Sequence, residues 1–158
     1  MTGGTVGDGC VFCRAASEDD PLVIHRGLRT YVILNLFPYN SGHVMVVPQR
    51  HIASLGEATP DELGELITLV RDAERVLTAA YAPHGINVGL NLGRAAGAGV
   101  ADHLHVHLVP RWNGDTNFMT VVADSRVLPE TLEQTAARLR PLFAGHQGAA
   151  PVGVQSGR

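Results

Sequence analysis

Three histidines stand at alternate positions in the stretch DHLHVHLVPRW, which covers residues 102–112. Successive side chains of a β-strand point to opposite faces, so His103, His105 and His107 would share one face at intervals of about 6.6 Å. The apolar residues between them would then point together into a core. Three histidines on one face would be rare by chance, so the pattern predicts a strand that carries a functional site.

Two kinds of chemistry fit three neighbouring imidazoles. They could hold one catalytic metal ion that keeps an open coordination position. Alternatively, one imidazole could attack phosphorus as a nucleophile while a neighbour handles protons or charge. The glycine- and alanine-rich stretch between residue 91 and the histidines favours the second use, because its backbone N–H groups could hold a phosphate. All 12 basic residues are arginines, which excludes Schiff-base chemistry and a Walker-type lysine.

A second pattern lies near the start of the chain, where Cys10 and Cys13 form the motif GCVFC. This spacing is typical of half a zinc site or of a redox pair. A redox pair of the thioredoxin type follows a strand, whereas this pair follows a glycine-rich start. The zinc interpretation is therefore favoured, with a redox pair or two inert thiols as the alternatives.

Apolar periodicity predicts the regular elements. Strands are expected at 30–36, 43–48, 86–93 and 103–112, with a weaker strand at 22–27. The longest helix should begin at a capping box formed by Thr59 and Glu62, with Pro60 at its first position and Pro83 at its end. Its expected inward face consists of Leu63, Leu66, Ile67, Val70, Leu77 and Ala80.

A second helix is expected at 129–143, with an inward face of Leu132, Ala136, Leu139 and Phe143. Strands and helices in this order predict an α+β fold with a mostly antiparallel sheet.

Length and composition suit one globular domain, since the chain has 158 residues of which 45% are hydrophobic. We expect the domain at 10–143, with disordered segments at 1–9 and 144–158, which are rich in small residues. A net charge of −3 offers no basic surface for nucleic acid or anionic lipid. No apolar run approaches the roughly 20 residues of a membrane span, and the start lacks a secretory signal pattern. We therefore expect a cytoplasmic protein without membrane or nucleic-acid partners.

Several segments together resemble one known family. The run HLHVHLVPRW fits the signature of the histidine triad (HIT) superfamily of nucleotide hydrolases and transferases. The segments CVFC, LNLFPYNSGHVMVVPQRH, NVGLNLGRAAGAGVADH and WNGDTNFM are similar to other HIT segments, in the family's order, over roughly residues 10–140. The last two resemble the bacterial branch that contains diadenosine tetraphosphate phosphorylases and Fhit-like hydrolases. The resemblance implies a five-stranded antiparallel sheet with two main helices, and a homodimer.

The resemblance also implies roles for the triad. His105 would be the nucleophile that attacks the α-phosphorus of a nucleotide, and His107 would contact the phosphate oxygens and assist the leaving group. His103 would instead join Cys10, Cys13 and His51 in a structural zinc site, and no organic cofactor is expected. His43 is expected to give structural support.

The substrate site implied by the resemblance lies around these histidines. Asn35 would hold the ribose hydroxyls and Asn91 would lie near the phosphates. Phe12, Leu36 and Phe37 would line the base pocket. Relatives often contact the phosphate through a serine or glutamine before the triad. This chain has Gly97, Ala98 and Gly99 there, so backbone amides would have to serve.

The expected substrate is a diadenosine polyphosphate or a similar adenylylated compound, with adenine as the favoured base. Either water or inorganic phosphate could be the second acceptor, and Arg94 and Arg111 are the nearest candidates in the sequence for a second anion site. The alternatives are an adenylyl phosphoramidase, an AMP-releasing hydrolase of a particular pathway, and a nucleotide-binding module without turnover.

Overall fold

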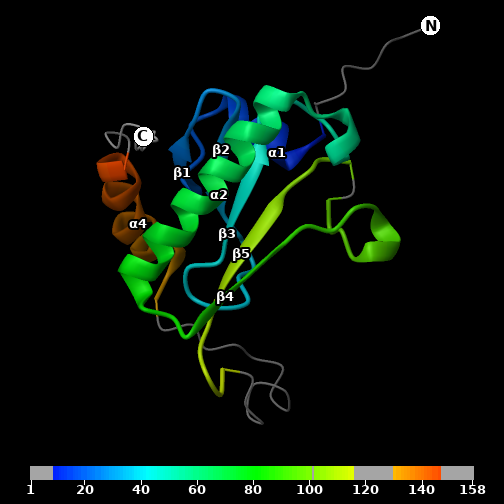
Figure 1. Ribbon diagram of the computed structural model, residues 1–158. Coiled ribbons are helices and arrows are strands. Elements are labelled where there is room, and N and C mark those ends of the chain that lie inside the picture. Colours follow the sequence, from blue (N-terminus) through cyan, green and yellow to red (C-terminus); the bar gives the residue numbers. More distant parts are fainter. Residues whose placement is uncertain (1–8, 101, 116–129, 147–158) are drawn as a thin grey trace, which may run out of the picture.

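The computed structural model describes residues 9–100, 102–115 and 130–146 of the chain (Figure 1). Five strands form one sheet: β1 (Val23–Arg26), β2 (Thr30–Leu34), β3 (Val44–Pro48), β4 (Gly85–Gly89) and β5 (Val106–Arg111). Three α-helices accompany them in the described residues: α1 (Val11–Ser17), α2 (Pro60–Tyr81) and α4 (Leu132–His146). Two short 3-10 helices are η1 (Leu55–Glu57) and η2 (Arg94–Ala96).

The sheet has the order β1-β2-β3-β5-β4, and each neighbouring pair is antiparallel. This confirms the expected five-stranded antiparallel sheet and its weaker first strand. The strand of the triad lies between β3 and β4, where His107 is paired with Met45 on one side and with Gly89 on the other. Because Gly89 has no side chain, the ring of His107 is left uncovered toward β4.

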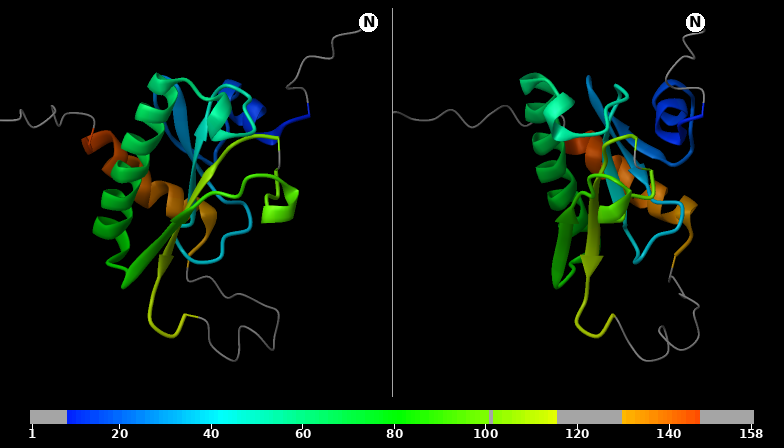
Figure 2. Two further views of the ribbon diagram at one scale, coloured as in Figure 1. Left: turned by 45° about the vertical axis from the view of Figure 1, so that its right-hand side comes forward. Right: turned by 90° about the vertical axis from the view of Figure 1, so that its right-hand side faces the viewer.

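Both faces of the sheet are covered at its centre. One face packs against α2 and α4 in a core that includes Val32, Val46, Leu108, Leu77 and Leu139. The opposite face packs against α1 through a smaller cluster that includes Phe12, Ala15, Tyr31, Ile33 and Met45. Figure 2 shows α1 and α2 on opposite sides of the sheet. Every residue of β2 and β3 is buried for this reason, which explains their uninterrupted apolar runs.

The long helix begins as the sequence predicts. The Thr59 hydroxyl accepts a hydrogen bond from the Glu62 N–H, the Glu62 carboxylate accepts one from the Thr59 N–H, and Pro60 is the first helical residue. The helix ends at Tyr81, where Ala82 adopts a left-handed conformation with φ of 44°. Its end thus falls just before Pro83, as expected.

The inward face of α2 differs in part from the prediction. Leu66, Val70 and Leu77 are buried and Ala80 packs against the core, whereas Ile67 is 66% exposed and Leu63 is 36% exposed. The buried stripe runs instead through Leu66, Leu69, Val70, Ala73, Val76 and Leu77. Leu63 and Ile67 lie on the flank of this stripe, about 60–120° around the helix from its centre at 100° per residue.

Two further expectations on regular structure need correction. The strand expected at 103–112 begins only at Val106, so His103 and His105 lie in the segment that leads into β5. The helix α1 was not predicted, because two turns with two buried residues give too short a periodic signal. The alternation itself is confirmed, since Leu104, Val106 and Leu108 are all buried in the core.

The second predicted helix is present, and Ala136, Leu139 and Phe143 are buried on its inward face, with Leu132 partly buried. It begins later than expected and continues to His146, so the last turn occupies residues that were assigned to a disordered tail. The remaining expected terminal segments, 1–8 and 147–158, lie outside the described residues.

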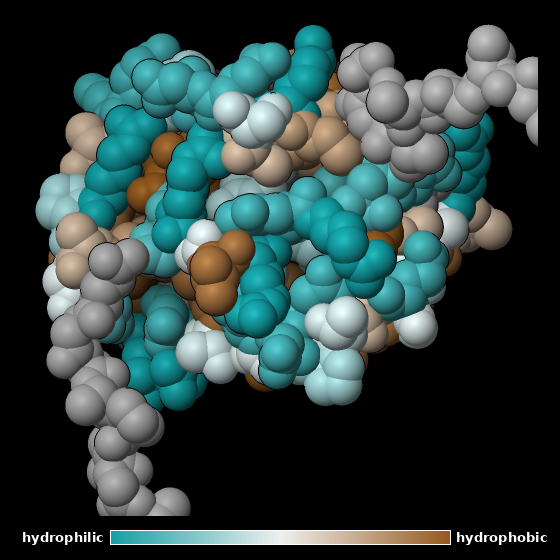
Figure 3. Space-filling model, turned by 90° about the horizontal axis from the view of Figure 1, so that it is seen from above, coloured by the Kyte–Doolittle hydropathy of each residue, from teal (hydrophilic) through white to brown (hydrophobic). Residues whose placement is uncertain are grey.

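The surface seen from above in Figure 3 is mostly hydrophilic, and apolar residues show there in small separate areas. Among the helices that the structure describes, none combines the length and the apolar character that crossing a membrane requires.

Candidate functional site

A cavity of about 1030 Å³ lies on the face of the sheet that carries α1. Its lining includes both expected catalytic residues, His105 and His107. The expected substrate-binding residues that line it are Phe12, Asn35, Leu36, Asn91, Gly97 and Gly99, and Phe37 also lines it. A volume of this size is at the upper end for a small-molecule site, which suits a ligand larger than one nucleoside.

His105 is held in one orientation. It is 5% exposed, and its Nδ1 lies 2.8 Å from the backbone carbonyl oxygen of His103. A carbonyl can only accept, so Nδ1 carries a proton and donates, and in the neutral ring Nε2 then has the lone pair. The ring of Phe12 packs against the imidazole with 5.0 Å between ring centroids. A neutral imidazole with a fixed, unprotonated Nε2 beside a cavity is suited to nucleophilic attack.

His43, which is not one of the triad histidines, orients His107. The Tyr39 N–H donates to Nδ1 of the buried His43 at 3.2 Å, so a neutral His43 carries its proton on Nε2. That Nε2 lies 2.9 Å from Nδ1 of His107 and donates to it. His107 in turn carries its proton on Nε2, where it can donate to a ligand in the cavity. His43 therefore sets the tautomer of His107, beyond the support expected from the sequence.

The rings of His105 and His107 are neighbours, with 4.9 Å between their centroids. Burial lowers the pKa of His107 below 6.5, and the adjacent His105 lowers it further. His107 is thus neutral near pH 7, in the state that the hydrogen bond from His43 requires.

The glycine-rich loop offers fewer free amides than expected. The N–H of Gly97 donates to the Arg94 carbonyl and the N–H of Ala98 donates to the Gly93 carbonyl. Ala98 is also absent from the lining of the cavity, although Gly97 and Gly99 contribute to it. Within the described residues, the N–H of Gly99 has no hydrogen-bond partner, and a Cβ placed on Gly99 would meet nothing within 4 Å. Gly99 therefore offers an unpaired backbone N–H and open space in the cavity that His105 and His107 also line.

The two asparagines are fixed by their own loops. The Asn35 side-chain oxygen accepts a hydrogen bond from the Phe37 N–H at 3.0 Å, within the loop that follows β2. The Asn91 amide donates to the carbonyl of Gly97 at 3.4 Å and ties the start of the glycine loop to its middle. Both residues reach the cavity from opposite sides of the triad strand, since Asn35 follows β2 and Asn91 follows β4.

Cys10, Cys13, His51 and His103 form a second group, called here the Cys2His2 cluster. Their Sγ and ring nitrogen atoms all lie within 4.8 Å of one another. The Sγ of Cys10 is 3.3 Å from Nδ1 of His103, and the Sγ of Cys13 is 3.2 Å from Nδ1 of His51. Tetrahedral zinc with Zn–S of about 2.3 Å and Zn–N of about 2.0 Å places such atoms about 3.5 Å apart. The donor set and its spacing therefore fit a four-coordinate metal.

The surroundings of the cluster support the same fit. Nε2 of His103 lies 2.8 Å from the carbonyl oxygen of Pro48, which fixes the proton on Nε2 and turns the Nδ1 lone pair toward the cysteines. Burial lowers the pKa of His103. Burial also raises the pKa of Cys13 to about 11, and the neighbouring Cys10 adds to this effect. A cation bound between the thiols would remove that penalty on the thiolate form.

These positions exclude one alternative from the sequence. The three triad histidines do not converge on a single metal, because His103 has Nδ1 beside the cysteines and Nε2 on the carbonyl of Pro48, whereas His105 and His107 line the cavity. Cys10 and Cys13 are also not an isolated pair of thiols, because His51 and His103 lie against them.

The arginines proposed for a second anion site lie elsewhere. Neither Arg94 nor Arg111 lines the cavity, and Arg111 forms an ion pair with Asp115 at 2.6 Å and a hydrogen bond with Asn87 at 2.9 Å. The cavity instead contains Arg14, from the second turn of α1. The sequence also did not predict that Ile33, Met45 and Tyr39 line the cavity, because this depends on which face of the sheet the cavity occupies.

Comparison with known proteins gives concordant results. The model of the HIT domain family matches residues 16–114. The chain is 50% identical over 128 residues to the AP-4-A phosphorylase of Mycobacterium tuberculosis (strain ATCC 25618 / H37Rv), covering 81% of this chain and 66% of that protein. It is 38% identical over 121 residues to the asymmetrical bis(5'-nucleosyl)-tetraphosphatase of Schizosaccharomyces pombe, covering 77% of this chain and 63% of that protein.

Among solved structures, a Zn-bound histidine triad family protein from Mycobacterium smegmatis superposes with a TM-score of 0.71 at 29% identity. The superposition covers 87% of this chain and 94% of the other. The chain spans just under two thirds of the length of the two curated relatives named above.

Proposed function

The chain belongs to the histidine triad (HIT) family, and from that premise we propose that it cleaves the α-phosphate linkage of a diadenosine polyphosphate. The observation that carries the proposal is the pair of hydrogen bonds that sets the two catalytic tautomers. One leaves a lone pair on Nε2 of His105, and the other leaves a proton on Nε2 of His107.

The first step is nucleophilic. Nε2 of His105 forms a bond to the α-phosphorus, and the bond from that phosphorus to the bridging oxygen breaks with its electron pair on the oxygen. The Nε2–H of His107 donates a hydrogen bond to the leaving oxygen and stabilises the negative charge that develops there, and the nucleotide departs as an anion while His107 keeps its proton. With diadenosine tetraphosphate, ATP departs and an adenylyl group stays on His105.

The second step transfers the adenylyl group to an acceptor and restores His105. Water gives AMP, whereas inorganic phosphate gives ADP. The open space at Gly99 would admit either acceptor, and the N–H of Gly99 would donate a hydrogen bond to the phosphate. Asn35 would hold the ribose, and Phe12 and Leu36 would contact the base.

The reaction is tested by incubating purified protein with diadenosine tetraphosphate, with and without millimolar phosphate, and separating the nucleotides. ATP with AMP means hydrolysis, and ATP with ADP means phosphorolysis. We expect His105→Asn to lose at least about a thousandfold in rate while nucleotide binding survives. The control is His84→Asn, an exposed histidine outside the cavity that should keep the rate.

Other outcomes would point to the alternatives. If diadenosine tetraphosphate is not cleaved but AMP is released from an adenylyl phosphoramidate, the substrate assignment is wrong and the nucleophile assignment stands. If nucleotides bind and none is turned over, the chain is a binding module.

We further propose that the Cys2His2 cluster holds zinc. Four protein ligands leave no open position, so the ion would supply folding free energy and would not take part in the reaction. The chain's cytoplasmic location and its lack of membrane and nucleic-acid partners stay predictions.

We also propose a homodimer. The edge strand β4 is largely exposed, with Val88 49% exposed. Glu65 of α2 accepts the Arg29 N–H between β1 and β2, so the opposite flank of α2, with Leu63 and Ile67, is directed toward β4. An edge strand beside exposed apolar side chains suits pairing with a second copy about a twofold axis. Light scattering should give the mass of two chains.

A further inference from the structure

The last residue of β3 and the segment that follows it both reach the Cys2His2 cluster. Pro48 offers its carbonyl oxygen to Nε2 of His103, and His51 places Nδ1 at 3.2 Å from the Sγ of Cys13. Residues 48–51 therefore hold one ligand directly and orient another. Gln49 is hydrogen-bonded to the carbonyls of Arg29 and Gly27, so the part of the segment nearest His51 needs a further anchor if the ligand contact is to persist.

Arg50 supplies an anchor in the middle of this segment. Its Nε lies 2.8 Å from Oε1 of Glu62, and one terminal nitrogen lies 2.9 Å from Oε2 of the same carboxylate. That nitrogen also donates to the carbonyl of Glu57 at 2.7 Å. A two-pronged guanidinium–carboxylate pair fixes direction as well as distance.

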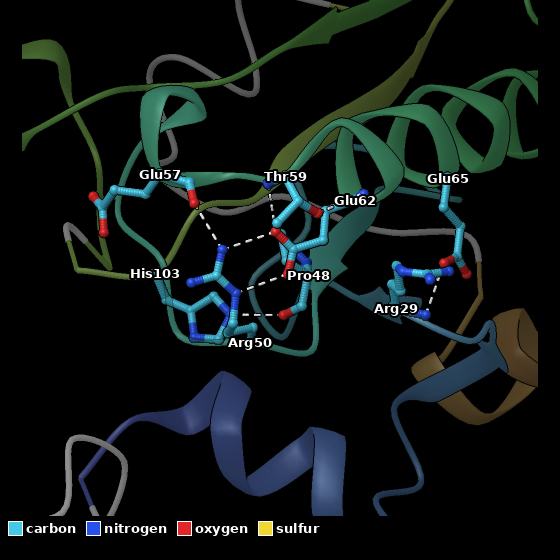
Figure 4. A network of polar contacts seen from close by, with 8 residues as sticks. All are labelled: Arg29, Pro48, Arg50, Glu57, Thr59, Glu62, Glu65 and His103. Carbon is cyan, nitrogen blue, oxygen red and sulfur yellow. Dashed lines mark hydrogen bonds and ion pairs between the residues drawn. The ribbon is translucent and has the colours of Figure 1, made fainter.

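The partner of Arg50 is itself rigid. Glu62 is 8% exposed and belongs to the capping box of α2, where its Oε2 accepts the Thr59 N–H at 2.8 Å. The hydrogen bond from Arg50 lowers the pKa of Glu62 to about 2, so the carboxylate is charged at neutral pH. Figure 4 shows these contacts together with the hydrogen bond between His103 and the carbonyl of Pro48.

We infer that the Arg50–Glu62 pair is a positioning device for the metal site, which docks residues 48–51 onto the first turn of α2 so that His51 and His103 meet the two cysteines. This inference rests on the proposed zinc site. The Arg50–Glu62 pair does not contact the ion. It would raise the affinity for zinc by holding the ligands His51 and His103 in the right orientation.

A second arginine, Arg29 between β1 and β2, contacts the same helix and offers a matched control. Arg29 forms an ion pair with Asp61 at 3.6 Å, and its backbone N–H donates to Glu65 at 2.7 Å. Figure 4 places Arg29 and Glu65 on the other side of Pro48 from His103. The side chains of Arg29 and Arg50 are similarly exposed, at 41% and 52%. Arg29→Met thus removes a side chain that also contacts the start of α2, while it keeps the backbone carbonyl of residue 29 that accepts the Gln49 N–H at 2.8 Å.

The experiment compares zinc binding by the wild type, Arg50→Met, Arg50→Lys and Arg29→Met. Each protein is stripped of metal and titrated with Zn²⁺ against a chromophoric chelator, at a temperature where circular dichroism shows the metal-free form folded. We expect Arg50→Met to raise the zinc Kd about 10–100-fold and Arg29→Met to leave it within about twofold. Arg50→Lys should fall between them, because an ammonium keeps the charge but not the two-pronged geometry.

Each outcome decides something. If the wild type binds no zinc, the proposed site fails and this inference fails with it. If the wild type binds zinc and Arg50→Met binds it equally well, only the positioning role is wrong. An equal loss in Arg29→Met would show that any weakening of the start of α2 suffices, which also overturns the role. If Arg50→Met does not fold, Glu62→Gln replaces it, with Glu65→Gln as its control.

Discussion

His103, His105 and His107 have identical side chains, yet each meets a different partner at Nδ1. The first faces two thiols, the second donates to a backbone carbonyl and the third accepts from His43. Since the hydrogen bond at one ring nitrogen determines the proton at the other, these partners suit the three residues to the proposed roles of metal ligand, nucleophile and hydrogen-bond donor to the leaving group. The roles differ because the neighbours differ.

Gly42, directly before His43, shows how closely that arrangement depends on single residues. Its φ is +80°, and a Cβ there would lie 2.7 Å from Cε2 of Tyr81. We expect Gly42→Ala to lower the free energy of unfolding by about 1–3 kcal/mol and to slow turnover, because relief of the clash shifts His43 away from His107.

The control for that change is Gly64→Ala on α2, where a Cβ would meet nothing within 4 Å. Alanine is the better helix former, so this variant should gain about 0.5–1 kcal/mol. Urea unfolding of the zinc-loaded proteins measures both. Equal effects of the two substitutions would contradict the claim that Gly42 is required for its conformation.

At the scale of elements, α4 is docked onto β1 through an ionisable ring. His25 of β1 stacks on Phe143 of α4 with 5.3 Å between ring centroids and 19° between planes. Burial lowers the pKa of His25 below 6.5, and this outweighs Asp72 and Glu65, which raise it. The contact therefore favours a neutral imidazole.

A pH dependence of stability follows from this contact. As the pH falls below about 6.5, the unfolded chain binds a proton at this position before the folded chain does, so the free energy of unfolding decreases. Above that pH neither state is protonated there, and the contribution is constant. His25→Phe keeps the stack and removes the proton, so it should reduce the slope of stability against pH between 5 and 6.5 by up to about 1.4 kcal/mol per unit. An unchanged slope, measured by urea unfolding at several pH values, would contradict this assignment.

At the scale of the whole molecule, the Cys2His2 cluster joins three distant parts of the chain. The cysteines come from the start of α1, His51 from the segment after β3, and His103 from the segment before β5. The same α1 carries Phe12 against His105, so the cluster also supports one wall of the cavity.

We expect the double change Cys10→Ser and Cys13→Ser to abolish zinc binding and to lower the melting temperature, because the binding free energy of a structural metal is part of the folding free energy. Partial activity should remain, since no zinc ligand is the nucleophile. Elemental analysis, thermal unfolding and the diadenosine tetraphosphate assay are the measurements. If elemental analysis found no metal in the purified wild-type protein, the zinc site would be wrong. If the double variant folded but lost all activity, the structural role of the zinc would be wrong.

Short-range patterns in the sequence determined much of this protein. The alternation of histidines with Leu104, Val106 and Leu108 predicted which side chains enter the core, and Thr59 with Glu62 predicted where the long helix begins. Such features depend on backbone geometry over a few residues, which sequence spacing specifies directly. The motifs around the triad also identified the family before any geometry was known.

Only the tertiary structure decided which groups meet. His43 reaches His107 across 64 positions and Cys10 reaches His103 across 93, and both contacts exist because β5 lies between β3 and β4 and α1 covers that face. The exposure of Ile67 and the engagement of the Ala98 amide within its own loop likewise depend on surfaces and turns that periodicity does not specify. Local spacing sets the direction of a side chain, whereas its partner is set by packing between segments far apart in the sequence.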